Sequence, residues 1–237
     1  MIDASPAPDP NRGLTPCPDC NEREVMIYPK FERLWHWSQA GSIMALMFTG
    51  LAMNGFHNLI SFEMAVKIHT LVALALLLLW VFATFWLFTT GNYKVFLPRI
   101  FGLFQVARYY AYGVFKGEHH PYQKSLAQRL NPLQALAYSV LKTVVFPLVW
   151  GTGIIYLTYN FWETLPNAPF WLEVVANLHL AVAWFVAGFV ILHIYLLTIG
   201  HSFFQGVRPM IRGTEKVALT PEQEAYLERH ETWRLVD

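Results

Sequence analysis

Two histidines within one apolar stretch are the residues of this sequence whose type and spacing most clearly suggest chemistry. His179 and His193 lie fourteen residues apart in the almost wholly apolar segment 177–201. In an α-helix, fourteen residues give about 21 Å of rise and leave the two side chains within roughly 40° of each other. Polar side chains in lipid are costly, so they usually face the bundle interior and mark a cofactor or a pathway. We therefore expect two buried imidazoles on one helix face, one near each side of a membrane.

The composition indicates the class of protein that must hold these histidines. Of the 237 residues, 55% are hydrophobic, 16% aromatic and only 14% charged, which is too apolar for an ordinary soluble domain. We expect an integral membrane protein. The net charge of +1 comes without a basic, aromatic-interleaved stripe, which argues against nucleic-acid binding.

Four stretches are long and apolar enough to cross the ~30 Å hydrocarbon core as helices of about 20 residues. His36 lies near the start of the first stretch, and His69 lies in the first turns of the second. The expected fold is therefore an all-α, integral membrane four-helix bundle. The stretches are 34–53, 65–90, 132–159 and 177–201.

The loop charges predict how the bundle is oriented. The loop between the second and third spans carries six basic residues against Glu118 alone, and basic loops stay on the cytoplasmic side. We therefore expect both termini in the cytoplasm and an even number of spans. Segment 98–115 mixes aromatic and basic residues, which predicts an interfacial helix on the inner leaflet. The six residues are Lys94, Arg99, Arg108, Lys116, Lys124 and Arg129.

This orientation sorts the four histidines of the spans into two pairs by depth. His36 and His193 would share the cytoplasmic half of the membrane, and His69 and His179 the opposite half. Each pair draws one member from the fourth span. Two bis-histidine haems stacked across a membrane require this arrangement of iron ligands, so we expect two b-type haems.

The five other histidines are expected at the surface or the membrane interface. His57 is the most plausible substitute if His69 is not a ligand, and His201 could line a site at the inner surface. The five residues are His57, His119, His120, His201 and His230. Four glycines, Gly41, Gly151, Gly153 and Gly188, could give a porphyrin room against the helices or serve plain helix packing.

Polar residues at the start of the third span suggest a second ligand. Asn131 before Pro132 is typical of a helix N-cap followed by a first-turn proline. Asn131 and Gln134 would also lie at the depth of His36 and His193, where a quinone carbonyl could use them. Lys142, deeper in the span, could extend toward the interface or pair with a haem propionate.

The two ends of the chain carry no membrane span. We expect a flexible extension over residues 1–30, a cytochrome domain over 31–212 and a charged cytoplasmic tail over 213–237. The proline-rich extension predicts neither a signal peptide nor a packed element. Its Cys17 and Cys20 lack the following histidine of a c-type haem motif, so a structural turn or partner contact is favoured over a metal or redox site.

These residues match a known pattern. Over about Tyr28 to Arg212, the sequence resembles the four-helix di-haem cytochrome b family of the formate dehydrogenase gamma subunit, the nickel-iron hydrogenase cytochrome b and the thiosulfate reductase cytochrome b. The segments FERLWHW, TTGNYK and NPLQALAY lean toward the thiosulfate reductase branch. The CPDC extension and the long charged tail depart from the family pattern.

The resemblance implies a role for each candidate residue. His36 and His193 would ligate the cytoplasm-side haem, His69 and His179 the other haem, and Asn131 would help bind a menaquinone beside the inner haem. Gln134 and His193 complete the expected quinone site, for menaquinone or ubiquinone. The implied protein is a subunit of the inner membrane that anchors a quinone-linked oxidoreductase complex and carries its electrons. Its partners would be an iron-sulfur or multihaem subunit and a catalytic subunit on the outer face.

Two other functions remain open from the sequence. Histidines could form transient sites in a transporter of haem or divalent metal, although the spans lack the intramembrane carboxylates and broken helices that ion-coupled transport commonly uses. The chain could also be a structural anchor that has lost one haem.

Overall fold

The computed structural model describes residues 20–98, 100–118, 121–122, 130–198 and 203–236. The chain is mostly helical and divides into two compact units. The helical unit comprises residues 34–90 and 140–200, and the terminal unit comprises residues 1–33, 91–139 and 201–237.

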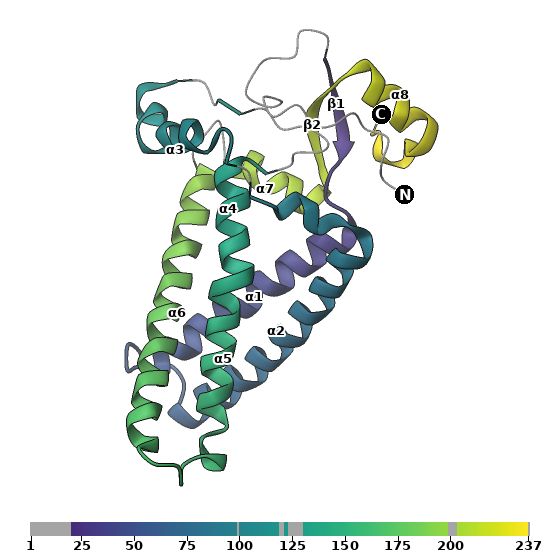
Figure 1. The fold of residues 1–237 in the computed structure, drawn as a ribbon. Coiled ribbons are helices and arrows are strands. Elements are labelled where there is room, and N and C mark those ends of the chain that lie inside the picture. Colours follow the sequence, from purple (N-terminus) through teal and green to yellow (C-terminus); the bar gives the residue numbers. More distant parts are fainter. Residues whose placement is uncertain (1–19, 99, 119–120, 123–129, 199–202, 237) are drawn as a thin grey trace. The chain divides into compact units, whose positions relative to one another are not determined.

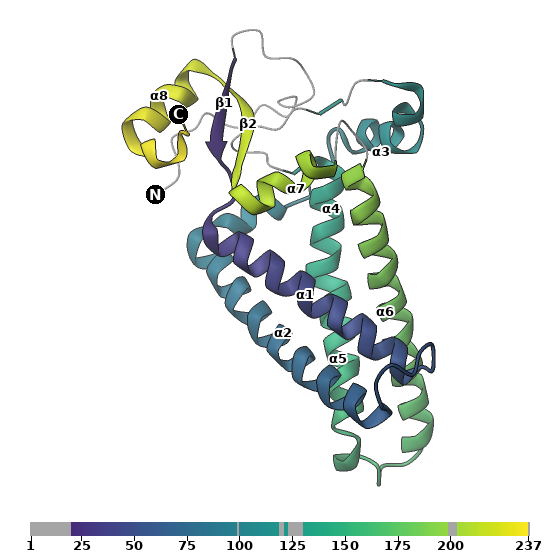
Figure 2. The same ribbon diagram turned by 180° about the vertical axis from the view of Figure 1, so that it is seen from behind.

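The helical unit is built from long helices (Figures 1 and 2). A short 3₁₀ turn, Tyr159–Phe161, follows the third span. The third span begins in α4 and passes through a π-helical turn, Leu141–Val145, into α5. The long helices of this unit are α1 (Lys30–Met53), α2 (Phe62–Thr90), α5 (Phe146–Leu157) and α6 (Ala168–Thr198), whereas α4 (Pro132–Val140) belongs to the terminal unit except for its last residue.

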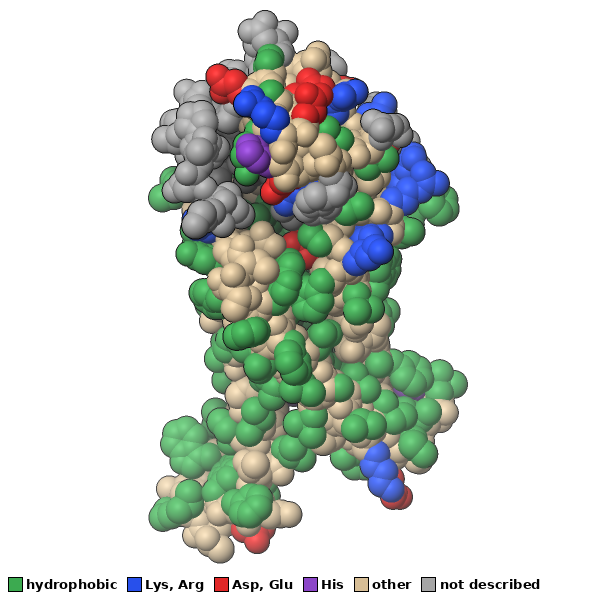
Figure 3. Space-filling model, turned by 90° about the vertical axis from the view of Figure 1, so that its right-hand side faces the viewer, with side chains coloured by type: hydrophobic (Ala, Val, Ile, Leu, Met, Phe, Trp, Pro, Cys, Tyr) green, Lys and Arg blue, Asp and Glu red, His purple; other side chains and the backbone are tan. Residues whose placement is uncertain are grey.

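Within the described part of the chain, three helical stretches are long and apolar enough to cross a membrane. They are Phe62–Thr90, Pro132–Leu157 and Ala168–Thr198. Large side chains such as Leu71, Leu78 and Phe85 remain exposed along α2, as expected of a face in contact with lipid. Figure 3 shows hydrophobic side chains spread over the surface of these helices with few charged ones. The structure is therefore mostly helical with candidate membrane helices, as the expected all-α membrane fold requires, although it also contains the small sheet described below.

Helix α1 differs from the other three candidate spans. Its 24 residues correspond to about 36 Å, which is enough to cross the hydrocarbon core. However, Lys30, Glu32 and Arg33 occupy its first turn, and His36, Ser38, Gln39 and Ser42 follow within three turns. These polar groups lower its mean hydropathy, so the fourth span remains a prediction.

The connection between the second and third spans contains one short α-helix. It begins after Gly102, whose φ of 79° suits glycine, and covers α3, Leu103–Ala111. Two 3₁₀ turns flank it, at Asn92–Phe96 and Gly113–Lys116. The expected interfacial helix therefore exists but is shorter than the segment 98–115, and its location on a leaflet is untested.

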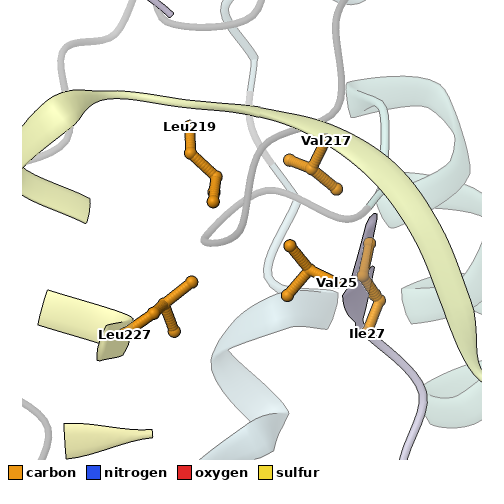
Figure 4. Close-up of a cluster of buried hydrophobic side chains, with 5 residues drawn as sticks. All are labelled: Val25, Ile27, Val217, Leu219 and Leu227. Carbon is orange, nitrogen blue, oxygen red and sulfur yellow. The ribbon is translucent and has the colours of Figure 1, made fainter. Parts of the chain in front are cut away.

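The two ends of the chain form a small antiparallel sheet in the terminal unit. Strand β1 (Asn21–Met26) pairs with β2 (Thr214–Leu219), with Asn21 opposite Leu219 and Met26 opposite Thr214. Figure 4 shows side chains of both strands pointing toward Leu227 of α8 (Pro221–His230). The buried cluster is Val25, Ile27, Val217, Leu219 and Leu227. Helix α7 (Phe203–Arg212) precedes β2, and a 3₁₀ turn, Thr232–Arg234, follows α8.

The strand β1 was not anticipated from the sequence. A packed element was not expected before residue 30, whereas Val25 and Ile27 are buried. The six residues of β1 include three charged side chains, and its partner strand lies nearly the whole chain away, so no local pattern indicates the pairing. The proposed domain boundaries are not tested by this finding.

Candidate functional site

The helical unit brings the four predicted histidines together as two pairs. The ring centres of His36 on α1 and His193 on α6 are 6.5 Å apart. Those of His69 on α2 and His179 on α6 are 6.4 Å apart. The pairs are the ones expected from depth, and both members from the fourth span lie on the uninterrupted helix α6.

The spacing of each pair suits two imidazoles that bind one metal from opposite sides. Metal–imidazole bonds of about 2 Å, with roughly 1 Å more from each nitrogen to its ring centre, place the ring centres about 6 Å apart. The described residues contain no group of three or more His, Cys, Asp or Glu side chains that could hold a metal ion. Two axial histidines suffice for haem iron, whose other four ligands come from the porphyrin. The residues present therefore fit haem.

Thr49 of α1 holds the ring of His69. Its Oγ1 lies 2.9 Å from His69 Nδ1 and 2.8 Å from the backbone carbonyl of Ala45. This contact occupies Nδ1 and leaves Nε2 as the nitrogen for a metal.

Thr152 of α5 holds His179 in the same way. Its Oγ1 lies 3.0 Å from His179 Nδ1 and 2.7 Å from the carbonyl of Leu148. Thr152 Oγ1 also lies 3.1 Å from the carbonyl of Val149. Both imidazoles of this pair therefore have the same hydrogen-bonding environment, supplied by two different helices.

A glycine follows each of these threonines and lies against the same ring. A Cβ at Gly153 would be 3.3 Å from His179 Cε1, and one at Gly50 would be 3.7 Å from His69 Cε1. A Cβ at Gly41, Gly151 or Gly188 would have no atom within 4 Å. Of the four glycines singled out in the sequence, only Gly153 therefore approaches a histidine, and Gly50 was missed.

The His36 and His193 pair has different surroundings. His36 packs edge-on against Trp37, and His193 stacks on Phe189 with an interplanar angle of 12°. His36 Nδ1 is buried and has no hydrogen-bond partner among the described residues. Aromatic packing, rather than hydroxyl groups, orients this pair.

Lys142 lies in the π-helical turn, next to the aromatic side chain that precedes His36. Its ammonium nitrogen is 4.0 Å from the centre of the Trp35 ring, a cation–π distance. Trp35 is buried, and its Nε1 has no hydrogen-bond partner in the described part of the chain. Extension toward the interface and pairing with a haem propionate both remain hypotheses for Lys142.

The predicted quinone ligands Asn131 and Gln134 cap helix α4 in the terminal unit. Gln134 N donates to Asn131 Oδ1 at 2.8 Å, and Asn131 N donates to Gln134 Oε1 at 3.2 Å, which confirms the N-cap prediction. Asn131 Nδ2 donates to Tyr110 Oη at 3.3 Å. Burial raises the pKa of Tyr110, although its bond to Asn131 opposes that shift, so the phenol stays neutral at physiological pH.

The other described histidines, His57 and His230, and the described cysteine, Cys20, do not join the pairs. His57 Nε2 donates to the backbone carbonyl of Phe48 at 2.9 Å, and His230 packs beside Tyr226. Cys20 is disulfide-bonded. His119, His120, His201 and Cys17 lie outside the described residues.

Burial identifies the site residues that the sequence reasoning missed. Among the described residues, three polar side chains are buried: Thr49, Asn131 and Thr152. Two of them contact candidate haem ligands, and the third is a candidate quinone ligand. The sequence offers little to find the threonines by, because the Thr-Gly pair of positions 49–50 and 152–153 also occurs at 90–91, where no histidine pair lies among the described residues.

Comparison with known proteins agrees with this geometry. A family model described as prokaryotic cytochrome b561 matches residues 27–213. The chain belongs to the prokaryotic cytochrome b561 family. It is also 27% identical, over 85% of its length and 78% of the relative's, to the Escherichia coli (strain K12) protein named "Putative cytochrome YdhU". The resemblance to a cytochrome b family is confirmed.

Membership of the cytochrome b561 family establishes the general activity. The protein is a multi-pass membrane protein of the prokaryotic inner membrane that binds b-type haem and transfers electrons. The fourteen-residue separation on one helix, together with the matching histidines of α1 and α2, is the feature of the sequence that indicated it.

Proposed function

We propose that this cytochrome is a di-haem membrane subunit that carries electrons between a partner redox subunit and the quinone pool. The observation that supports it most directly is the pairing of four histidines into two sets with ring centres 6.4 and 6.5 Å apart. When bound, haem supplies one-electron redox chemistry at nearly constant iron coordination. The four histidines would supply the imidazoles that hold the iron, and the helices would fix the orientation of these rings and enclose them in apolar surroundings.

The spacing of the two pairs supports passage of electrons across the membrane. His179 and His193 are separated by fourteen residues of continuous helix, which corresponds to about 21 Å of rise. The hydrocarbon core is about 30 Å thick. Two cofactors bound at these depths would lie near opposite sides and form a conduit between them.

The β1–β2 sheet supports four crossings. Residues 21–26 and 214–219 are hydrogen-bonded to each other, and an open two-stranded sheet does not exist in the hydrocarbon core. We infer that both segments lie on the same side of the membrane, which requires an even number of crossings between them. Three helical stretches within the described residues have the hydropathy of spans, so α1 is proposed as the fourth crossing.

The basic residues indicate which side holds the sheet. Lys94, Arg108 and Lys116 lie in the described part of the loop between α2 and α4, and such residues concentrate in the cytoplasm. We therefore propose that both termini lie inside, with the His36 and His193 pair in the inner half of the membrane and the other pair in the outer half. A partner with iron-sulfur clusters or several haems would exchange electrons on the outer face.

The quinone is proposed to bind near the inner haem. Asn131 and Gln134 offer amide groups at the start of the third span, and the neutral phenol of Tyr110 hydrogen-bonds Asn131. Hydrogen-bond donors of this kind suit a quinone carbonyl, and His193 would link the quinone to the haem it ligates. Menaquinone or ubiquinone would be the diffusible substrate.

The ligand assignment is tested with His179→Ala and a matched control. We expect the wild-type chain to hold two b haems, and His179→Ala to lose one while the absorption spectrum of the other persists. His57→Ala removes a histidine of the same helical unit that bonds a backbone carbonyl, so it should retain both. Unchanged haem content in His179→Ala would overturn the pairing, and a wild-type chain without haem would favour a transporter.

A further inference from the structure

We propose that Thr49 and Thr152 are positioning residues that fix the tautomer of His69 and His179 and lower the reduction potential of the haem these histidines bind. This inference rests on the proposed ligand set. Neither threonine would touch the cofactor, because each acts through the ring nitrogen that faces away from the iron.

The hydrogen-bond geometry determines which nitrogen of each ring carries the proton. Thr49 Oγ1 has one proton and lies 2.8 Å from the carbonyl of Ala45, which can only accept. With that proton donated to Ala45, the contact of 2.9 Å requires His69 Nδ1–H to donate to Thr49 Oγ1. Nε2 of the neutral ring then keeps its lone pair for a metal.

The arrangement occurs a second time on separate helices. Thr152 Oγ1 lies 2.7 Å from the carbonyl of Leu148 and 3.0 Å from His179 Nδ1. Both threonines are almost fully buried, at 1% and 6% exposure. A threonine hydroxyl that bonds to the carbonyl four residues earlier is common in helices. Here two such hydroxyls also hydrogen-bond the two histidines of one pair, one each.

The expected effect on the haem follows from the direction of the hydrogen bond. An imidazole that donates its outer N–H becomes a more basic ligand, and a more basic ligand stabilises ferric over ferrous iron. His36 Nδ1 has no such partner among the described residues. The two threonines therefore lower the potential of one haem selectively, which favours electron transfer from it to the haem of His36 and His193.

Valine substitutions test this role while preserving side-chain shape. We expect T49V and T152V each to shift one wave of the potentiometric haem titration to higher potential and leave the other wave unchanged. The double variant should shift it further. A tenfold loss of ferric preference corresponds to about 59 mV for one electron. Haem retention should also weaken, by up to about 100-fold in affinity.

The controls separate positioning from general stability. Thr89 also bonds the carbonyls three and four residues earlier, those of Trp86 and Phe85, and hydrogen-bonds no histidine among the described residues, so T89V should leave both potentials unchanged. T49S and T152S keep the hydroxyl and should restore the wild-type potentials. If a valine variant fails to accumulate, the serine variant and the other threonine still test the same bond.

The outcomes distinguish this inference from the proposed function. A wild-type protein without two haems contradicts the ligand set itself. Two wild-type haems with potentials that do not change in T49V, T152V or the double variant contradict only the role of the threonines. Equal shifts of both waves, or serine variants that behave like valine, would also overturn it.

Discussion

At the scale of single residues, Gly153 offers a direct test of the proposed haem site, because it lies against the ring of His179. A Cβ at Gly153 would lie 3.3 Å from His179 Cε1, whereas one at Gly151 on the same helix would meet nothing within 4 Å. We expect Gly153→Ala to push the ring and reduce haem retention several-fold. Gly151→Ala should retain haem and gain up to about 1 kcal/mol in stability, because alanine suits a helix interior better.

Haem content per purified chain and thermal unfolding measure these two effects separately. Gly50→Ala should fall between the two variants, since its Cβ would be 3.7 Å from His69 Cε1. If Gly151→Ala loses as much haem as Gly153→Ala, the close approach of Gly153 to the ring is not what holds the cofactor.

The pairing of the histidines could be predicted from the sequence, but their hydrogen bonds could not. Helical periodicity places His179 and His193 on one face, and hydropathy with the loop charges assigns His36 and His69 to them by depth. Thr49 and Thr152 carry no comparable signal, because a threonine in a helix usually bonds only its own backbone. Their role depends on the rotation of α1 against α2 and of α5 against α6, which a single sequence does not specify.

At the scale of elements, the start of α4 combines a structural role with a proposed binding role. Asn131 caps the helix through its Oδ1 and bonds Tyr110 through its Nδ2. Serine can cap a helix as well as asparagine, whereas alanine costs about 0.5–2 kcal/mol. We expect Asn131→Ser to keep the stability of the protein but to slow haem reduction by a quinol several-fold.

Stopped-flow reduction by a menaquinol analogue, with thermal unfolding as the control, measures this difference. Asn131→Ala should show both defects. Quinol reduction in Asn131→Ser at the wild-type rate would restrict Asn131 to capping.

Gly213, directly before β2, contacts the residues that directly follow β1. Gly213 has φ of 89°, and a Cβ there would be 2.7 Å from the carbonyl oxygen of Tyr28. Its own carbonyl accepts hydrogen bonds from Ile27 and Tyr28. A left-handed conformation costs an L-residue about 1–2 kcal/mol. We expect Gly213→Ala to destabilise the sheet by more than this, because the added Cβ would also clash with Tyr28.

Hydrogen exchange of the Asn21–Met26 amides measures this loss of pairing. Gly117→Ala is the matched control, because Gly117 also has a positive φ but open space around it. Equal exchange rates in both variants would show that the close approach of Gly213 to Tyr28 does not contribute to the stability of the sheet. The sheet itself could not be predicted from the sequence. Neither strand has a strong strand pattern of its own, and the two are far apart in the sequence.

At the scale of the whole molecule, the sheet and the spans together predict a topology. In the proposed topology β1 and β2, which pair with each other, lie on one side of the membrane, and α1 is the fourth crossing. We expect a cysteine introduced at His57, between α1 and α2, to react with an impermeant thiol reagent from outside intact spheroplasts. A cysteine at Glu222, in α8, should react only after the membrane is permeabilised. The endogenous Cys17 and Cys20 are replaced by serine in both variants.

Labelling of both positions from the same side would contradict the crossing of α1. The three helical stretches with the hydropathy of spans would remain, and α1 would have to bring His36 to His193 without crossing the bilayer. The sequence predicted this topology from charges alone, and the pairing of the two strands supports it independently.

The central claim is that four histidines hold two haems in one chain. The most direct measurement is the haem-to-protein ratio of the purified wild-type cytochrome, combined with electron paramagnetic resonance of its oxidised form. We predict two b haems per chain, both low-spin as expected of two axial imidazoles. One haem per chain, or a high-spin ferric signal of stoichiometric size, would contradict the assignment of His36, His69, His179 and His193 as two complete ligand pairs.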